Sequence, residues 1–298
     1  MKYAILDIGA NSIRLCVYEE KDNAFKTLFT KKVMAGLAYY VKDGEMSNQG
    51  IIEASNVIND FKELVNNFNI ENFYIFATAS FRNITNTDFV VMEIEKLTGE
   101  KIEVISGEDE ALYGFTGAKL KVKAKSGIVV DIGGGSTEIV DFEKDEVNFA
   151  DSLPIGSLNL YSMYVSEFLP NEKEQRNIKN KIQKVTKEID IKHTNTICGV
   201  GGTIKAALKL TNSYFKLNKD NTVIKREQME EIEKILLKKP QKAKNIIIKA
   251  CPDRVHTIIP GVLILDEILK KTKAKEIIVS KYGVREGYLC QKIMQKKK

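Results

Sequence analysis

Hydrophobic and polar positions alternate over three short runs at the start of the chain, with turn-like stretches between them. Alternation with a period of two is typical of strands, so residues 3–8, 13–19 and about 25–35 are predicted strands. Apolar residues from Ser47 to Phe68 recur at helical spacing, which predicts a helix with Ser47 as its N-cap. The pattern then predicts a strand at 72–78, a helix at 86–99 ending at Gly99, a strand at 101–106 and a helix from about Glu108.

The same order begins again near residue 126. Three strands are predicted at 127–132, 137–142 and about 146–153. Further on, the pattern predicts helices at about 156–168, 172–188, 201–210, 226–238, 241–249 and 253–271, strands at 195–198 and 275–280, and a terminal helix over 281–298. Three strands followed by alternating helices and strands therefore occur twice, about 124 residues apart. The repeat predicts two α/β domains, residues 1–123 with 284–298 and residues 124–283, joined near 121–127.

The turn after the first strand of each half has the same chemistry. An aspartate is followed by glycine at the second position and serine at the fifth, in "DIGANS" from Asp7 and in "DIGGGS" from Asp131. Glycines let backbone N–H groups approach an anion, and a leading aspartate can hold Mg²⁺. The alternative is a tight turn without a ligand, but its recurrence in both domains favours phosphate binding. The candidate phosphate-binding residues are Gly9, Asn11, Ser12, Gly133, Gly134, Gly135, Ser136 and Thr137, with Gly201 and Gly202 in a third turn, "GVGGT".

The composition indicates the class of protein but not the reaction that it catalyses. Of the 298 residues, 43% are hydrophobic and 29% charged, as in a globular protein with two cores. The net charge of +6 suits either a polyanionic partner or, as the scattered lysines favour, a lysine-rich solvated surface. Four dispersed cysteines indicate neither a disulfide framework nor a zinc site. With no leader before the first strand and no apolar run of about 20 residues, we expect a cytoplasmic protein with no membrane and no nucleic-acid partner.

Eight segments occur in an order that resembles one known family. They are "DIGANSIRL", "ATASFRN", "SGEDEALYGFTG", "DIGGGSTEIV", "LPIGSLNL", "GVGGT", "DRVHTIIPG" and "SKYGVREG". The resemblance is to the Ppx/GppA phosphatases, which are exopolyphosphatases and guanosine pentaphosphate phosphohydrolases of the actin-like superfamily. It implies two actin-like, ribonuclease H-like α/β domains with mixed five-stranded sheets flanked by helices, and an active site in the cleft between them. It also suggests a homodimer.

The resemblance assigns roles to matching residues. Glu110 corresponds to the general base that orients the attacking water, and Arg82 to an arginine near the transferred phosphoryl group. Asp131 and Glu138 correspond to metal-linked carboxylates; with Asp7 they are the predicted Mg²⁺ ligands. Glu110 could instead be an acidic residue that complements a helix dipole, and Arg82 a surface arginine. Phosphoanhydride hydrolysis depends mainly on positioning and charge stabilisation, which suits this set of residues.

Three positions depart from the family pattern. The family commonly has Glu at the position of Asp109, Ser or Thr at that of Ala10, and Arg at that of Asn159. The chain also ends at residue 298, whereas longer members continue into a helical C-terminal part, so processivity on long chains is left open. The leading interpretation is a Mg²⁺-dependent exopolyphosphatase acting on inorganic polyphosphate. Guanosine pentaphosphate (pppGpp) is the alternative substrate. A non-catalytic polyphosphate or alarmone sensor is the second alternative, and an ATP-driven kinase or chaperone is less consistent with a chain that lacks an extra substrate domain.

Overall fold

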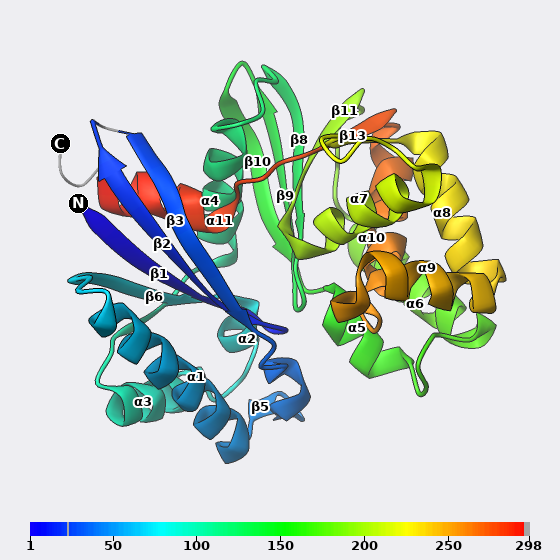
Figure 1. The fold of residues 1–298 in the computed structure, drawn as a ribbon. Coiled ribbons are helices and arrows are strands. Elements are labelled where there is room, and N and C mark those ends of the chain that lie inside the picture. The colour runs from blue at the N-terminus through cyan, green and yellow to red at the C-terminus, as the bar shows by residue number, and fades with distance from the viewer. Residues whose placement is uncertain (23, 295–298) are drawn as a thin grey trace. The chain divides into compact units, whose positions relative to one another are not determined.

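The computed structural model describes residues 1–22 and 24–294 (Figure 1). Its internal contacts divide the chain into two compact units, Met1–Gly107 and Glu108–Lys298. The division falls at the start of a helix rather than near 121–127. The predicted domain boundaries, 1–123 with 284–298 and 124–283, stay a prediction.

The first unit contains a five-stranded mixed sheet, the number predicted. Its strands are β1 (Lys2–Ile8), β2 (Ile13–Lys21), β3 (Ala24–Val33), β6 (Asn72–Ala77) and β7 (Ile102–Val104). They lie in the order β3-β2-β1-β6-β7, antiparallel from β3 to β1 and parallel from β1 to β7. The parallel pair β1 and β6 needs a crossover connection. Helix α1 (Asn48–Asn67) lies in that connection, after the antiparallel strands β2 and β3.

Local signals fix the ends of the helices in the first unit. The Ser47 hydroxyl accepts a hydrogen bond from the N–H of Gly50, which confirms the predicted N-cap of α1. Helix α3 (Thr87–Thr98) ends at Gly99, whose φ of 71° is left-handed, as the predicted stop requires. Four short elements had no sequence signal of their own: the 3₁₀ turn Leu37–Tyr40, β4 (Val41–Lys42), β5 (Glu45–Met46) and α2 (Ala79–Arg82).

The second unit has a mixed sheet with one strand more than predicted. Its strands are β8 (Ser126–Ile132), β9 (Thr137–Glu143), β10 (Glu146–Leu153), β11 (Thr196–Val200), β12 (Val223–Lys225) and β13 (Glu276–Val279). The order is β10-β9-β8-β11-β13-β12. The added strand, β12, pairs antiparallel with β13 at the edge. Three residues are too few to show alternation, so only the pairing identifies this strand. Two helix-flanked mixed sheets, each starting with an antiparallel triplet, confirm the predicted α/β class.

The helices of the second unit follow the predicted order with two differences. They are α4 (Gly107–Lys119), α5 (Ser157–Tyr164), α6 (Glu172–Thr186), α7 (Gly201–Phe215), α8 (Arg226–Lys238), α9 (Pro240–Ala250), α10 (Ile258–Thr272) and α11 (Val284–Tyr288). Helix α10 begins at Ile258, not at 253, after a 3₁₀ turn over Pro252–Arg254. Pro260 then lies in its first turn, where proline is tolerated.

The predicted terminal helix is shorter and less regular than expected. After α11 the chain continues as a π-helix, Leu289–Met294, and residues 295–298 lie outside the described residues. The backbone at α11 lies in close contact with the backbone of α4. A Cβ added to Gly117 would lie 1.9 Å from the Gly283 carbonyl oxygen, and one added to Gly287 would lie 1.8 Å from that of Tyr113. These glycines therefore allow α11 to hold α4, the helix that carries Glu110.

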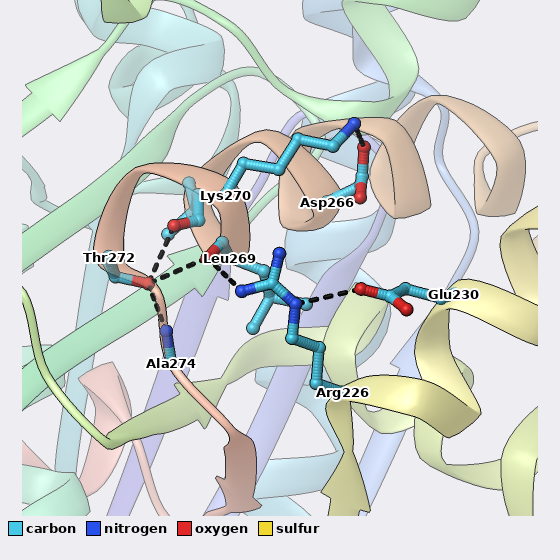
Figure 2. Close-up of polar contacts among 8 residues, drawn as sticks. Arg226, Glu230, Asp266, Leu269, Lys270, Thr272 and Ala274 are labelled. Atoms are coloured by element: carbon cyan, nitrogen blue, oxygen red, sulfur yellow. Dashed lines mark hydrogen bonds and ion pairs between the residues drawn. The ribbon is translucent and has the colours of Figure 1, made fainter.

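The end of α10 is fixed by side chains that satisfy its last carbonyl groups (Figure 2). The Thr272 hydroxyl donates to the carbonyl oxygen of Ile268 at 2.8 Å, and it accepts from the N–H of Ala274 at 3.3 Å. Arg226, at the start of α8, donates Nη1–H to the Leu269 carbonyl oxygen at 3.3 Å and pairs through Nε with Glu230 at 2.8 Å. Figure 2 also shows the ion pair of Lys270 with Asp266. Because α10 leads directly into β13, these contacts help to determine where that strand begins.

Candidate functional site

The two glycine loops form the same turn in the two units. In the first, the N–H of Gly9 donates to the carbonyl oxygen of Ser12 at 3.2 Å; in the second, the N–H of Gly133 donates to that of Ser136 at 2.9 Å. A Cβ on either glycine would lie 3.2 Å from the same acceptor oxygen. The shared bond and the shared close approach agree with the internal duplication read from the sequence.

In the first unit, a later segment binds the loop through its carbonyl groups. The carbonyl oxygen of Ala10 accepts from the N–H of Ala38 at 3.0 Å, and that of Asn11 accepts from the N–H of Gly36 at 3.1 Å. Ala10 is itself buried. The methyl side chain at this departure from the family pattern therefore packs inside the unit, while the backbone contacts that shape the loop are kept.

The equivalent carbonyl groups of the second loop are bound by the start of α5. The carbonyl oxygen of Gly134 accepts from the N–H groups of Leu158 and Asn159, and that of Gly135 accepts from Nδ2 of Asn159 at 2.9 Å. Among the described residues, the N–H groups of Gly134 and Gly135 donate no hydrogen bond. With its carbonyl groups engaged on one side, the loop presents these N–H groups as an anion-binding nest.

Asn159 has a structural role where the family pattern has arginine. Its Oδ1 accepts from the N–H of Gly156 at 2.8 Å while its Nδ2 holds Gly135, so one side chain connects the helix start to the loop. Gly156 must be a glycine here, because a Cβ would lie 2.4 Å from backbone atoms of Gly134. We expect Asn159→Ala to lower the free energy of unfolding by about 1–2 kcal/mol, since it removes a helix cap and leaves the half-buried Gly135 carbonyl group without this hydrogen bond.

Urea denaturation of the purified protein would measure this loss. The control is Ser162→Ala, at an exposed position of the same helix, which we expect to change stability by less than about 0.5 kcal/mol. Equal stability of the Asn159 and Ser162 variants would contradict the assigned role.

The strongest candidate for a metal site is a pair of carboxylates in the second unit. Asp131 of β8 lies directly opposite Glu138 of β9 in the antiparallel register, so their side chains share one face with Cβ atoms about 4.5–5.5 Å apart. Glu138 is 3% exposed and accepts a hydrogen bond from the Ser152 hydroxyl at 2.7 Å. Like charges placed opposite each other are destabilising, so this pair favours a cation.

The corresponding position in the first unit is different. Asp7 lies opposite Arg14 in the β1–β2 register, so its cross-strand neighbour is a cation rather than a second carboxylate. Asp7 is therefore less suited than Asp131 to share a metal ion. The described residues include no group of three or more His, Cys, Asp or Glu side chains arranged for a metal. Mg²⁺ commonly uses one or two protein carboxylates together with phosphate oxygens and water, so Asp131 and Glu138 fit it.

The third glycine turn lies against both Asp131 and an arginine. Gly201 has a φ of 83°, and a Cβ there would lie 1.9 Å from Oδ1 of Asp131. A Cβ on the next residue, Gly202, would lie 2.2 Å from Nη2 of Arg254. The turn opens α7, whose first N–H groups add positive partial charge. Glycine at these two positions therefore lets a carboxylate and a guanidinium approach the same helix start.

Arg254 was not among the sequence-predicted site residues, although it lies in the family-like segment "DRVHTIIPG". Its side chain is only 11% exposed, and its ion contact with the half-exposed Asp253 is a long one, 3.9 Å from Nε to Oδ2. Burial lowers the pKa of the Arg254 guanidinium, which nevertheless stays charged. A buried guanidinium at a helix start is suited to bind phosphate oxygens. The signal that could have identified it is its place in that segment, since only six arginines occur in the chain.

Glu110, the predicted general base, is buried, and Arg82, the predicted phosphoryl-binding arginine, is oriented by a hydrogen bond to the backbone. Glu110 lies in the first turn of α4 and is 7% exposed, whereas Glu108 and Asp109 in the same turn are exposed. The buried carboxylate is thus the one that the family-like spacing selects. Arg82 ends α2 and donates from Nη1 to the Ile105 carbonyl oxygen at 3.1 Å, which orients its guanidinium within the first unit.

The hydroxyl of Thr137, one of the candidate phosphate-binding residues, is engaged within the protein. Its side chain is fully buried, and the hydroxyl donates to the Ile155 carbonyl oxygen at 2.7 Å. It therefore supports the turn before α5 instead of pointing its proton at a ligand. Ser136 is 3% exposed, while Ser12 in the first unit is half-buried. The candidate phosphate donors of the second loop are accordingly backbone N–H groups.

The cysteines and histidines form no catalytic arrangement. All four cysteines are free, and burial raises the pKa of the Cys198 thiol to about 12 and that of Cys251 to about 11, so both stay protonated at neutral pH. His256 packs against aromatic rings, 5.0 Å from Tyr161 and 5.8 Å from Phe168 between centroids. No helix within the described part of the chain combines the length and apolar character needed to cross a bilayer.

Comparison with known proteins gives several relatives over most of the chain. The sequence is 30% identical to the bifunctional 3-dehydroquinate synthase/phosphatase of Fusobacterium nucleatum, over 98% of this chain and 47% of that protein. It is 28% identical to the guanosine-5'-triphosphate,3'-diphosphate pyrophosphatase of Photobacterium profundum, over 68% of this chain and 42% of that protein. The chain thus spans less than half the length of these two curated relatives. A putative exopolyphosphatase of Haemophilus influenzae is 25% identical over 96% of this chain and 90% of its own length.

Solved structures agree with these relatives. The Ppx/GppA enzyme of Aquifex aeolicus is 27% identical, covers 97% of this chain with 98% of its own, and superposes with a TM-score of 0.76. An exopolyphosphatase from Cytophaga hutchinsonii has the same fold, with a TM-score of 0.87 at 19% identity, covering 99% of this chain and 98% of its own. Residues 16–296 match the sequence model of the Ppx/GppA phosphatase family. With the duplicated glycine loops, this match means that the chain belongs to the Ppx/GppA phosphatase family.

Proposed function

We propose that this protein is an exopolyphosphatase, which hydrolyses the terminal phosphoanhydride of inorganic polyphosphate and releases orthophosphate. The observation that carries the proposal is the cross-strand pair Asp131 and Glu138 beside a glycine turn that also receives Arg254. Carboxylates for a metal, a buried guanidinium and free loop N–H groups are the parts that phosphoryl transfer to water requires.

Each residue has a defined part in the proposed reaction. Glu110 orients a water molecule and takes its proton as the water oxygen attacks the terminal phosphorus. The bridging P–O bond breaks, and its electron pair stays with the shortened chain. The N–H groups of Gly134 and Gly135, with the Arg254 guanidinium, bind phosphate oxygens whose charge changes during the step. Mg²⁺ held by Asp131 and Glu138 would neutralise phosphate charge.

Residues of the first unit take part in the same proposal. The loop Gly9, Asn11 and Ser12 would bind phosphate through its N–H groups and the Ser12 hydroxyl, and Arg82 would bind the transferred phosphoryl group. Asp7 would bind Mg²⁺ through water, more weakly than Asp131 because its cross-strand neighbour is Arg14. Substitution of Arg82 in the first unit should therefore reduce turnover, as should substitution of Glu110 in the second.

The alternative substrate is pppGpp, which ends in the same phosphoanhydride. One specific observation favours it: the Photobacterium relative and several others carry names of guanosine-5'-triphosphate,3'-diphosphate pyrophosphatases. The match covers only 42% and 58% of the length of two of those proteins, whereas it covers 90% of the putative exopolyphosphatase of Haemophilus. This difference in matched length supports polyphosphate as the first candidate substrate. A sensor without turnover remains the second alternative.

A direct comparison of substrates tests the proposal. Purified protein with Mg²⁺ is given polyphosphates of several lengths and pppGpp in one buffer, and the initial rate of orthophosphate release gives kcat/KM for each. We expect polyphosphate to have the highest kcat/KM. A higher value for pppGpp would support the alternative, and binding without release of phosphate from either substrate would support the sensor.

A further inference from the structure

A cavity of about 180 Å³ lies in the second unit, away from the glycine loop. It is lined by the first residues of β8, the last residues of β9 and the loop before β11, whereas the glycine loop connects the other ends of β8 and β9. The polar side chains that line it include Asp141, Glu143, Lys192 and His193. None of these residues takes part in the proposed hydrolysis.

Asp141 is an unusual residue for its position. It is only 9% exposed, and its cross-strand neighbours are apolar, Ile128 on one side and Phe149 on the other. A carboxylate at a core-facing strand position is costly unless a cation or hydrogen bonds compensate it. Places where a local rule is broken in this way are expected to be functional or strained.

The compensation that the chain itself provides is weak. Nζ of Lys192 lies 3.8 Å from Oδ2 of Asp141, at the long end of an ion pair, and the lysine side chain is 64% exposed. Among the described residues, the Asp141 carboxylate receives no hydrogen bond from a side chain or the backbone. An exposed lysine can move away at little cost, because such pairs contribute about 1 kcal/mol or less.

Size and charge define what the cavity can take. Its volume of about 180 Å³ is below the roughly 300 Å³ or more of a typical drug-sized pocket. A second carboxylate, Glu143, lies at the exposed end of β9. Among the described residues, the side chains that line this cavity do not include a group of three His, Cys, Asp or Glu that could hold a metal ion. The cation that pairs with Asp141 in the chain itself is already an ammonium on a four-carbon chain, that of Lys192.

We propose that this cavity binds the ammonium group of a linear aliphatic diamine or polyamine. Asp141 forms the ion pair with one ammonium group inside the cavity, and Glu143 at the rim attracts the second. Lys192 acts as an internal competitor, which the incoming amine displaces from Asp141. The site is independent of the proposed hydrolysis and stabilises the second unit when it is occupied.

Calorimetric titration of the full chain with 1,4-diaminobutane, without Mg²⁺, tests the site. We expect one diamine bound per chain, and Asp141→Asn to abolish binding. Lys192→Ala should strengthen binding about two- to fivefold, because it removes the competing ammonium group. This variant is at an exposed side chain, so it keeps the test valid if Asp141→Asn fails to fold.

The control is Glu146→Gln, at an exposed carboxylate in β10 that does not line the cavity. It should leave the affinity for the diamine unchanged. The proposal is overturned if the diamine does not bind, if Lys192→Ala leaves the affinity unchanged or weakens it, or if Glu146→Gln weakens binding as much as Asp141→Asn. Competition by millimolar KCl or MgCl₂ equal to that by the diamine would assign the cavity to a metal cation instead.

Discussion

Glu110→Gln is expected to lower kcat for phosphate release by about 10²- to 10⁴-fold, the usual contribution of a general base. Glutamine keeps the size of the side chain and its ability to hold a water molecule, but it cannot take the proton. Glu110 is 7% exposed in the first turn of α4, so the substitution also removes a buried negative charge without opening a cavity. Initial rates with polyphosphate and with pppGpp measure the effect.

The matched control for this prediction is Glu108→Gln, in the same helix turn. Glu108 is exposed, so losing its interaction with the helix dipole should cost about 0.3–1 kcal/mol of stability and leave kcat unchanged. Binding of polyphosphate to the Glu110 variant should match the wild type. If both variants lose kcat equally, or if the Glu110 variant keeps full kcat, Glu110 is not the base.

Gly201→Ala is expected to reduce activity by about 10²-fold or more. At a φ of 83° an alanine costs about 1–2 kcal/mol of backbone strain. Its Cβ would also lie 1.9 Å from Oδ1 of Asp131, so the carboxylate must move by at least about 1 Å, a displacement that can cost 10²-fold in rate. We further expect the Mg²⁺ concentration for half-maximal activity to rise.

Gly44→Ala separates backbone strain from the displacement of the carboxylate. Gly44 also has a φ of 83°, but the nearest atom to an added Cβ is Cγ2 of Thr85 at 3.6 Å, an ordinary contact. This variant should lose a similar 1–2 kcal/mol of stability and keep its Mg²⁺ dependence and activity. Should Gly201→Ala show only the stability loss, the carboxylate of Asp131 would not be the feature that Gly201 accommodates.

Strong local signals in the sequence predicted most elements. Ser47 and Gly99 end their helices as expected, because capping depends on residues that are neighbours in the chain. The strand β12 and the start of α10 were missed or misplaced. Strand β12 depends on its pairing with β13. The start of α10 depends on two prolines: Pro252 begins the preceding 3₁₀ turn, and Pro260 lies in the first turn of α10.

The candidate site divides in the same way. The two glycine loops could be read from the sequence, since the residues that form each turn lie within six positions. The roles of Asn159, Thr137 and Arg254 could not, because each depends on which backbone group lies beside the side chain. Asn159 illustrates this: at a position where a charge was expected, its amide connects α5 to the loop.

The sequence by itself determined that the chain is a duplicated α/β protein with two phosphate-type loops and a family-like set of acidic residues. These properties depend on periodicity and short spacing, which a linear pattern records. The tertiary structure decided that Asp131 faces Glu138 while Asp7 faces Arg14, that Arg254 reaches Gly202, and that Asp141 lies in a cavity. Strand register and close backbone approach bring these groups together, and both arise only when distant segments pack.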